Sequence, residues 1–273
     1  MLVQPRLASA VMLLRDRPAE QGIEVFMVRR VIQSDFMPDV YVFPGGSISK
    51  DDNAAELTRN ICASVDPLPS DPQGHTALGR GMRAAAIREL FEEAGVLLAY
   101  HNDAIISIPA EDVARFAPYR QAFQQRGGSL VAMARAEGLT LATDRLGYFA
   151  HWITPEGMPK RFDTHFFITT APSEQETAHD QLETSEGIWI APIDALAGYK
   201  QGTFPLVFAT IYQLRELAAF NSVEAALAHS ATQPVPTRIP ILEMQDGGPA
   251  RVHLAGEDDD QWDVPEHMRR PKQ

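Results

Sequence analysis

The stretch Arg88-Glu89-Leu90-Phe91-Glu92-Glu93-Ala94-Gly95-Val96 carries three carboxylates whose spacing fits one face of a helix. Residues i, i+3 and i+4 of a helix lie close together, so Glu89, Glu92 and Glu93 are predicted to share a face. Clustered carboxylates repel one another unless a cation lies among them or some of them hold protons. An all-oxygen cluster suits Mg²⁺ or Mn²⁺ better than zinc. The sequence therefore predicts a divalent metal site on this helix.

The residues around the carboxylates support this interpretation. Arg88 can orient a neighbouring carboxylate through its planar guanidinium, and Gly95 supplies the left-handed residue that ends a helix. Upstream, the turn Phe43-Pro44-Gly45-Gly46 lets a backbone carbonyl point toward a metal or a phosphate group. The alternative is a solvated acidic helix face, which would explain neither the arginine nor the glycine turn.

Residues 88–96 are similar to the second half of the Nudix box of Nudix hydrolases, G-x5-E-x7-R-E-U-x-E-E-x-G-U, where U is a bulky aliphatic residue. Gly46 would be the first glycine of the box. In that signature the arginine follows the glycine by 14 positions, whereas Arg88 follows Gly46 by 42, so 28 residues are inserted. The internal glutamate stays unassigned, because counting forward gives Asp52 and counting back gives Arg80.

The resemblance implies an α/β fold of the α+β kind, a Nudix-type α/β/α sandwich with a mixed sheet, helical insertions and a C-terminal extension. It also implies hydrolysis of a diphosphate linkage with Mg²⁺ or Mn²⁺ as the cofactor. The expected metal ligands are Glu89, Glu92, Glu93 and the backbone carbonyl at Gly46.

Catalytic roles are implied for Arg88, Glu89, Glu93 and Glu183. Arg88 would orient Glu89. Either Glu89 or a loop acid would accept the proton of the attacking water, and the resemblance leaves that choice open. Glu183, which stands shortly before Trp189, is the first candidate for the loop acid, and Glu186 is the second.

The long insertion, with Trp152-Ile153-Thr154-Pro155 and Arg161-Phe162-Asp163-Thr164, resembles the branch that contains a peroxisomal coenzyme A diphosphatase. This implies CoA or acyl-CoA as substrate, split to 3′,5′-ADP and 4′-phosphopantetheine or its acyl form. The candidate substrate contacts are Arg29, Arg30 and Arg161, which could equally be surface charges. A further signature of other CoA-cleaving members is incomplete, because Asp39 stands where its glycine would fall.

Two alternatives accompany this interpretation. ADP-ribose, a dinucleotide or a nucleotide sugar could be the substrate instead of CoA. A non-catalytic ligand-binding or regulatory protein is the alternative from another class, favoured only by the missing internal glutamate. The alternation of Arg161, Asp163 and His165 places polar side chains on one face of a strand, where they could face the substrate or simply be satisfied within the sheet.

Periodicity and turn residues predict the remaining organisation. A hydrolase domain is expected at 5–200, with an insert at 47–80 and a helical insert at 110–138 that forms either a lid or a packing surface. Helices and a hairpin at 201–256 should pack on the same domain, before a loose tail at 257–273. The expected strands are 8–15 and 24–30 (a hairpin), 41–43 and 96–99; the expected helices are 52–64, 81–94, 194–199, 205–220 and 223–229.

Composition narrows the class of protein. The 273 residues carry a formal net charge of −12, which argues against a nucleic-acid binder. A single cysteine, Cys62, allows no intrachain disulfide. The apolar run 7–14 is too short to span a membrane, and the final Pro271-Lys272-Gln273 is not a peroxisomal address. Together with the resemblance, which implies a small-molecule diphosphate substrate, this leads us to expect a cytoplasmic enzyme with no membrane or nucleic-acid partner, either a monomer or a homodimer.

Overall fold

A mixed eight-stranded sheet lies at the centre of the computed structural model, which describes residues 3–17, 21–31, 37–106, 108, 112–173, 175–177, 184–244, 250–256 and 262–264. The strand order is β10-β2-β1-β9-β8-β11, with β3 beside β2 and β4 beside β1. The strands are β1 (Arg6–Asp16), β2 (Ile23–Arg30), β3 (Tyr41–Val42), β4 (Gly45–Ser47), β8 (Gly147–Ile153), β9 (Phe162–Thr170), β10 (Thr184–Ile190) and β11 (Thr237–Arg238).

Strand β1 organises this sheet because both of its faces are buried. Val11 and Leu13 belong to the core on one side, and Met12 and Leu14 belong to the core on the other. A strand that is buried on both faces has consecutive apolar residues, because the side chains on either side of it lie in the core, and residues 10–14 show this pattern. β1 pairs antiparallel with β2 and β4 and parallel with β9, which makes the sheet mixed.

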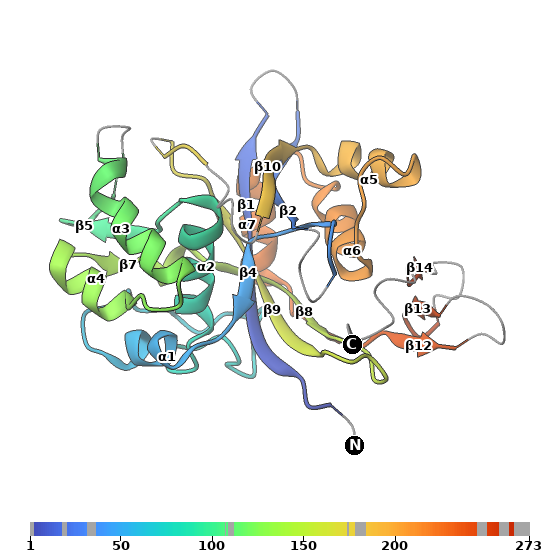
Figure 1. Ribbon diagram of the computed structural model, residues 1–273, viewed down its shortest axis with the longest axis horizontal. Coiled ribbons are helices and arrows are strands. Elements are labelled where there is room, and N and C mark those ends of the chain that lie inside the picture. The colour runs from blue at the N-terminus through green and yellow to red at the C-terminus, as the bar shows by residue number, and fades with distance from the viewer. Residues whose placement is uncertain are drawn as a thin grey trace.

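Helices cover the two faces of the sheet, as Figure 1 shows. One face packs against α1 (Lys50–Leu57), α2 (Met82–Ala94), α3 (Val113–Gln124) and α4 (Leu130–Glu137). The other packs against α5 (Pro192–Lys200), α6 (Phe208–Leu217) and α7 (Val223–Thr232). The predicted α/β/α sandwich with helical insertions is confirmed.

Smaller elements extend the two ends of the sandwich. β5 (Ala99–His101), β6 (Ala104–Ile105) and β7 (Thr140–Leu141) form one small sheet, with the short 3-10 helix Thr143–Arg145 following it. β12 (Ile241–Glu243), β13 (Arg251–His253) and β14 (Trp262–Asp263) form another. In the expected tail, Trp262 and Val264 are buried and β14 pairs with β13, so these residues are packed rather than loose.

Two predicted elements have different bounds from those expected. The helix predicted at 52–64 spans Lys50–Leu57, because a capping box between Ser49 and Asp52 starts it earlier and Asn60 has a left-handed φ of 63° beyond its end. The strand predicted at 96–99 begins only at Ala99. The side chain of Gln175 bonds the N–H and C=O of Leu97, where a neighbouring strand would otherwise pair.

Helix α2 is buried along almost its whole length and receives its cap from another helix. Its N-cap residue, Gly81, has a left-handed φ of 73° and no side-chain cap. Instead, the buried carboxylate of Glu56 on α1 accepts backbone N–H groups at the start of α2. The donors are the N–H groups of Gly79, Arg80, Gly81, Arg83 and Ala84. This one carboxylate accepts the hydrogen bonds of the free N–H groups, and its negative charge interacts favourably with the positive end of the helix dipole.

Replacing Glu56 with alanine should therefore lower the free energy of unfolding by about 3 kcal/mol or more, because several buried N–H groups lose their acceptor. Urea denaturation followed by circular dichroism measures this change. Glu156→Ala, which removes an exposed turn carboxylate, is the matched control and should change stability by less than about 0.5 kcal/mol. Equal stabilities of the two variants would contradict the capping role.

Candidate active site

The glycine turn places backbone directly against the carboxylates of α2. The side of Gly46 that a side chain would occupy faces Glu89, whose Cδ atom would lie 2.7 Å from an added Cβ. A Cβ at Gly45 would lie 2.6 Å from the backbone oxygen of Ser9 on β1. The Gly45 N–H donates to Oε2 of Glu93 at 3.0 Å. The obstructing atoms at Gly45 include backbone atoms, so no larger residue fits there, and the glycine turn lies in contact with the carboxylates of α2.

Arg88 is the centre of a buried ion-pair network. Its Nε and Nη2 atoms donate to the two oxygens of Asp52 at 2.9 and 3.0 Å, a two-pronged pairing. Its Nη1 donates to Glu89 Oε1 at 2.7 Å and to Glu92 Oε2 at 3.2 Å. Nη2 also donates to the carbonyl oxygen of Ser47, at the end of β4. Arg88 thus fixes the orientation of two of the three α2 carboxylates.

Asp52 answers the question that residue counting left open. It lies six positions after Gly46, has an exposed fraction of 0 %, and holds Arg88 across 36 positions of sequence. The insertion therefore lies between this acid and the arginine, and aspartate stands where the box carries glutamate. Glu56, one helical turn further along α1, was missed entirely; its only signal in the sequence was its i, i+4 spacing from Asp52.

The three carboxylates on α2 are all nearly inaccessible to solvent. Burial raises the pKa of Glu89 to about 7; the positive charge of Arg88 opposes this rise, and the negative charge of Glu92 adds to it. Although burial alone would lower the pKa of Arg88, the charges and hydrogen bonds of Glu89 and Asp52 raise it above its ordinary value.

The C-terminal end of α2 is held by helix α3 of the helical insert. Arg120 donates to the carbonyl oxygens of Glu92 and Glu93 at 3.0 and 3.3 Å, and Gln124 also donates to that of Glu92. A cation and an amide at this end complement the negative pole of the helix dipole. The insert thus packs against the carboxylate-bearing turn, whereas its predicted alternative role as a lid remains a prediction.

The predicted substrate-binding arginines lie in other contacts. Arg29 on β2 donates to Asp39 at 2.8 Å and lies 4.0 Å from Glu186, and the hydrogen bond to Asp39 raises its pKa. The guanidinium of Arg161, just before β9, donates to the backbone oxygens of Thr154 and Val3. Arg30 lies at the end of β2, opposite the start of β10. Their roles in substrate binding remain predictions.

The two candidate loop acids have different outcomes. Glu183 lies outside the described residues, so its predicted catalytic role remains a prediction. Glu186 lies within β10 rather than in a loop, and it accepts a hydrogen bond of 2.6 Å from the hydroxyl of Tyr41. Its described contacts therefore connect it to β2 and β3.

Comparison with known proteins places this geometry in a family. The family model described as the NUDT19 Nudix domain matches residues 72–217, more than half of the chain. The chain belongs to the Nudix hydrolases of this type. The predicted family and branch are confirmed, and the chain is a Nudix pyrophosphohydrolase.

Relatives and a solved structure agree with the assignment. The chain is 24% identical over 270 residues to the acyl-coenzyme A diphosphatase NUDT19 of Xenopus laevis, covering 86% of this chain and 70% of the relative. Identity to the Gallus gallus protein of the same name is 26% over 261 residues, covering 80% and 69%. The crystal structure of a NUDIX hydrolase from Alicyclobacillus acidocaldarius superposes with a TM-score of 0.70 at 26% identity, covering 86% of this chain and 99% of that one. Among the described residues, no helix has the length and apolar character needed to cross a membrane.

The raised pKa of Glu89 predicts a pH effect on the stability of metal-free protein. Between about pH 4.5 and 7 the folded chain holds a proton on Glu89 that the unfolded chain has lost, so stability falls as pH rises through this window and then levels off. The loss should be on the order of 2–3 kcal/mol.

Urea unfolding in the presence of a chelator, at pH 5 and pH 8, measures this effect. The wild-type protein should lose more stability between the two pH values than Glu89→Gln, which cannot ionise. The same pH dependence in both proteins would show that Glu89 titrates at its ordinary pKa.

Proposed function

We propose that this Nudix hydrolase is a metal-dependent diphosphatase of CoA and acyl-CoA. The observation that carries the metal dependence is the buried cluster of Glu89, Glu92 and Glu93, which lies against the Gly45-Gly46 backbone and is oriented by Arg88. The similarity to proteins named acyl-coenzyme A diphosphatase supports the substrate class.

The donor set fits Mg²⁺ or Mn²⁺. Carboxylate oxygens and a backbone carbonyl are the ligands that these hard cations prefer, so Glu89, Glu92, Glu93 and the Gly46 carbonyl would hold the ion. When bound, the ion would neutralise the diphosphate and polarise the attacking water.

The protein's own residues would position the reactants and take up the proton. Water adds across one phosphorus–oxygen bond of the diphosphate, which gives 3′,5′-ADP and 4′-phosphopantetheine or its acyl form. The released proton passes to a carboxylate, and Glu89 and Glu183 are the two candidate acceptors. Arg88 touches no reacting atom in this scheme but keeps Glu89 in place.

A hydrolysis screen resolved by mass spectrometry tests the substrate. With Mg²⁺ or Mn²⁺ and a mixture of CoA, acetyl-CoA, ADP-ribose, NADH and nucleotide sugars, we expect 3′,5′-ADP from the CoA compounds. Glu92→Gln and Glu93→Gln should each lower kcat/KM by at least about 100-fold, because a metal ligand is lost. Glu156→Gln, at an exposed turn, should retain full activity.

The outcomes of this screen separate the alternatives. Turnover of ADP-ribose or a nucleotide sugar, but not of CoA, would keep the metal site and overturn the substrate. Unchanged turnover in Glu92→Gln and Glu93→Gln would overturn the metal site itself.

Asp52→Asn tests whether Arg88 acts through its orientation. The variant keeps the size of the side chain but removes the charge that pairs with the guanidinium, so kcat should fall by about 10- to 100-fold with little change in KM. Steady-state kinetics at saturating metal measures both constants, and circular dichroism checks the fold. A change confined to KM would contradict a positioning role.

A further inference from the structure

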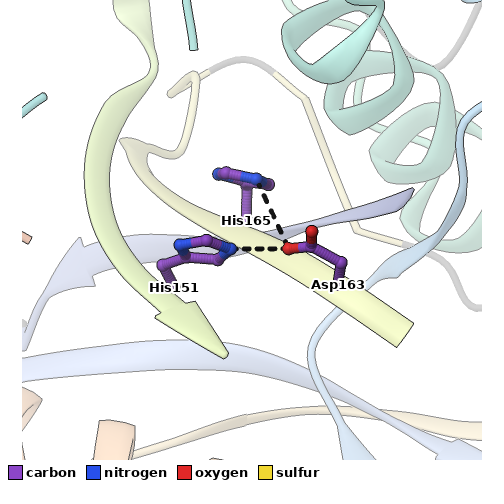
Figure 2. Close-up of side chains that lie close together, drawn as sticks. All are labelled: His151, Asp163 and His165. Atoms are coloured by element: carbon purple, nitrogen blue, oxygen red, sulfur yellow. Dashed lines mark hydrogen bonds and ion pairs between the residues drawn. The ribbon is translucent and has the colours of Figure 1, made fainter. Parts of the chain in front are cut away.

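A second cluster of metal-binding side chains lies on strands β8 and β9, as Figure 2 shows. His151 and His165 are direct partners in the antiparallel pairing of these strands, and Asp163 lies two residues before His165. One donor atom from each of the three lies within 4.8 Å of the others. Nε2 of His151 is 2.5 Å from Asp163 Oδ1, and Nε2 of His165 is 3.7 Å from the same oxygen.

Both imidazoles are held from behind by hydroxyl groups. The Tyr148 hydroxyl lies 3.1 Å from Nδ1 of His165, and the Thr237 hydroxyl lies 2.9 Å from Nδ1 of His151. These contacts turn the two Nε2 atoms toward Asp163. Histidines that bind metals commonly have one ring nitrogen held by such a partner, while the other faces the ion.

A hydrogen-bonded network alone explains only half of this geometry. The short contact between His151 and Asp163 is a hydrogen bond, but the 3.7 Å separation of His165 from the same oxygen is too long for one. Two donors around one ion with metal–ligand bonds near 2.1 Å lie roughly 3 to 3.5 Å apart. The two separations from Asp163 fall on either side of this spacing, so small shifts of the side chains would bring both nitrogens to it. The two rings stack with centroids 4.1 Å apart, so both Nε2 atoms lie on the same side of the carboxylate, and binding one ion requires one of the rings to tilt toward the other.

We propose that His151, Asp163 and His165 bind a divalent transition-metal ion of the zinc class. Two imidazole nitrogens and one carboxylate oxygen are a donor set that suits zinc and its neighbours and differs from the all-oxygen set on α2. A fourth position is left for water or a further donor.

Strand β1 lies between this site and the glycine turn that contacts the carboxylates of α2. Ser9 of β1 is paired with Gly46 of β4 on one side and with His165 of β9 on the other. Because neighbouring strands lie about 4.8 Å apart, His165 is roughly 10 Å from Gly46 along the sheet. The two sites share a face of the sheet but no ligand.

The insert between Asp52 and Arg88 covers the histidine site. The ring of His75 lies 6.1 Å from that of His151 and 6.2 Å from that of His165, and its Nδ1 is 3.3 Å from Asp71. His75 is thus the nearest further imidazole donor among the described residues. An ion at this site would fasten β8 and β9 beneath the insert.

An open cavity of about 580 Å³ lies beside the start of β1, next to this cluster. Leu7, one of its lining residues, is the β1 partner of Asp163. Arg80 lines the same cavity, and its positive charge acts on both Asp163 and His165. The negative charge of Asp163 counters this cation.

Titration calorimetry of the chelator-treated full chain with Zn²⁺, in excess Mg²⁺, tests the proposal. We expect about one equivalent to bind, and binding to weaken at least about 100-fold in His165→Gln and in Asp163→Asn. The double variant Glu92→Gln/Glu93→Gln should bind Zn²⁺ as the wild type does, which separates this site from the proposed active site. His101→Gln removes an exposed histidine and is the matched control.

Two further readouts identify the ligands. Co²⁺ in place of Zn²⁺ should give a visible spectrum typical of imidazole ligation, lost in Asp163→Asn. Zn²⁺ should also raise Tm in the wild type and in Glu92→Gln/Glu93→Gln but not in Asp163→Asn. If His165→Gln fails to fold, this comparison still tests whether Asp163 binds the ion. Zn²⁺ binding that is absent from the wild type, or lost only in Glu92→Gln/Glu93→Gln, would overturn the proposal.

Discussion

The structure around the active site depends on one buried guanidinium. Arg88 joins helix α1, helix α2 and the end of strand β4, through Asp52, Glu89 and the carbonyl oxygen of Ser47. Buried carboxylates without a partner would each cost several kcal/mol of desolvation, and removing one member of a buried ion pair typically costs about 3–5 kcal/mol. The arginine therefore allows acidic side chains to stand in the interior, where water competes little for whatever they bind.

The same network explains how the residues of the motif stay together in space although a long insertion separates them in the sequence. The inserted segment lies between Asp52 and Arg88, and buried contacts hold both of its ends in place. Asp52 holds Arg88, and Glu56 one turn later caps the start of α2. Because the entropy cost of closing a loop grows only slowly with its length, these two anchors suffice, and the segment between them is free to cover other parts of the sheet.

The sequence predicted those features of the site that depend on residues only a few positions apart in the chain. Glu89, Glu92 and Glu93 share a face because helical periodicity dictates it. Asp52 could not be chosen over Arg80, because counting residues across an insertion gives two answers and only the ion pair decides between them. The alternation in β9 indicated a polar face, but it did not distinguish Arg161, which bonds backbone oxygens, from His165. The pairing of His165 with His151 depends on a register shift between Tyr148 and Ala150, and the sequence pattern around these residues does not predict that shift.

Charge balance connects the network to the chemistry. Asp52, Glu89 and Glu92 all contact Arg88, and Glu93 lies one residue beyond, so the carboxylates outnumber the guanidinium. Burial and the charge of Glu92 raise the pKa of Glu89, so in the absence of an ion a proton on Glu89 reduces the negative charge of the cluster. A divalent cation would displace that proton and leave Glu89 charged. Arg88 holds the carboxylate of Glu89 by a hydrogen bond of 2.7 Å, so an ion bound as proposed would meet a carboxylate whose orientation is already set.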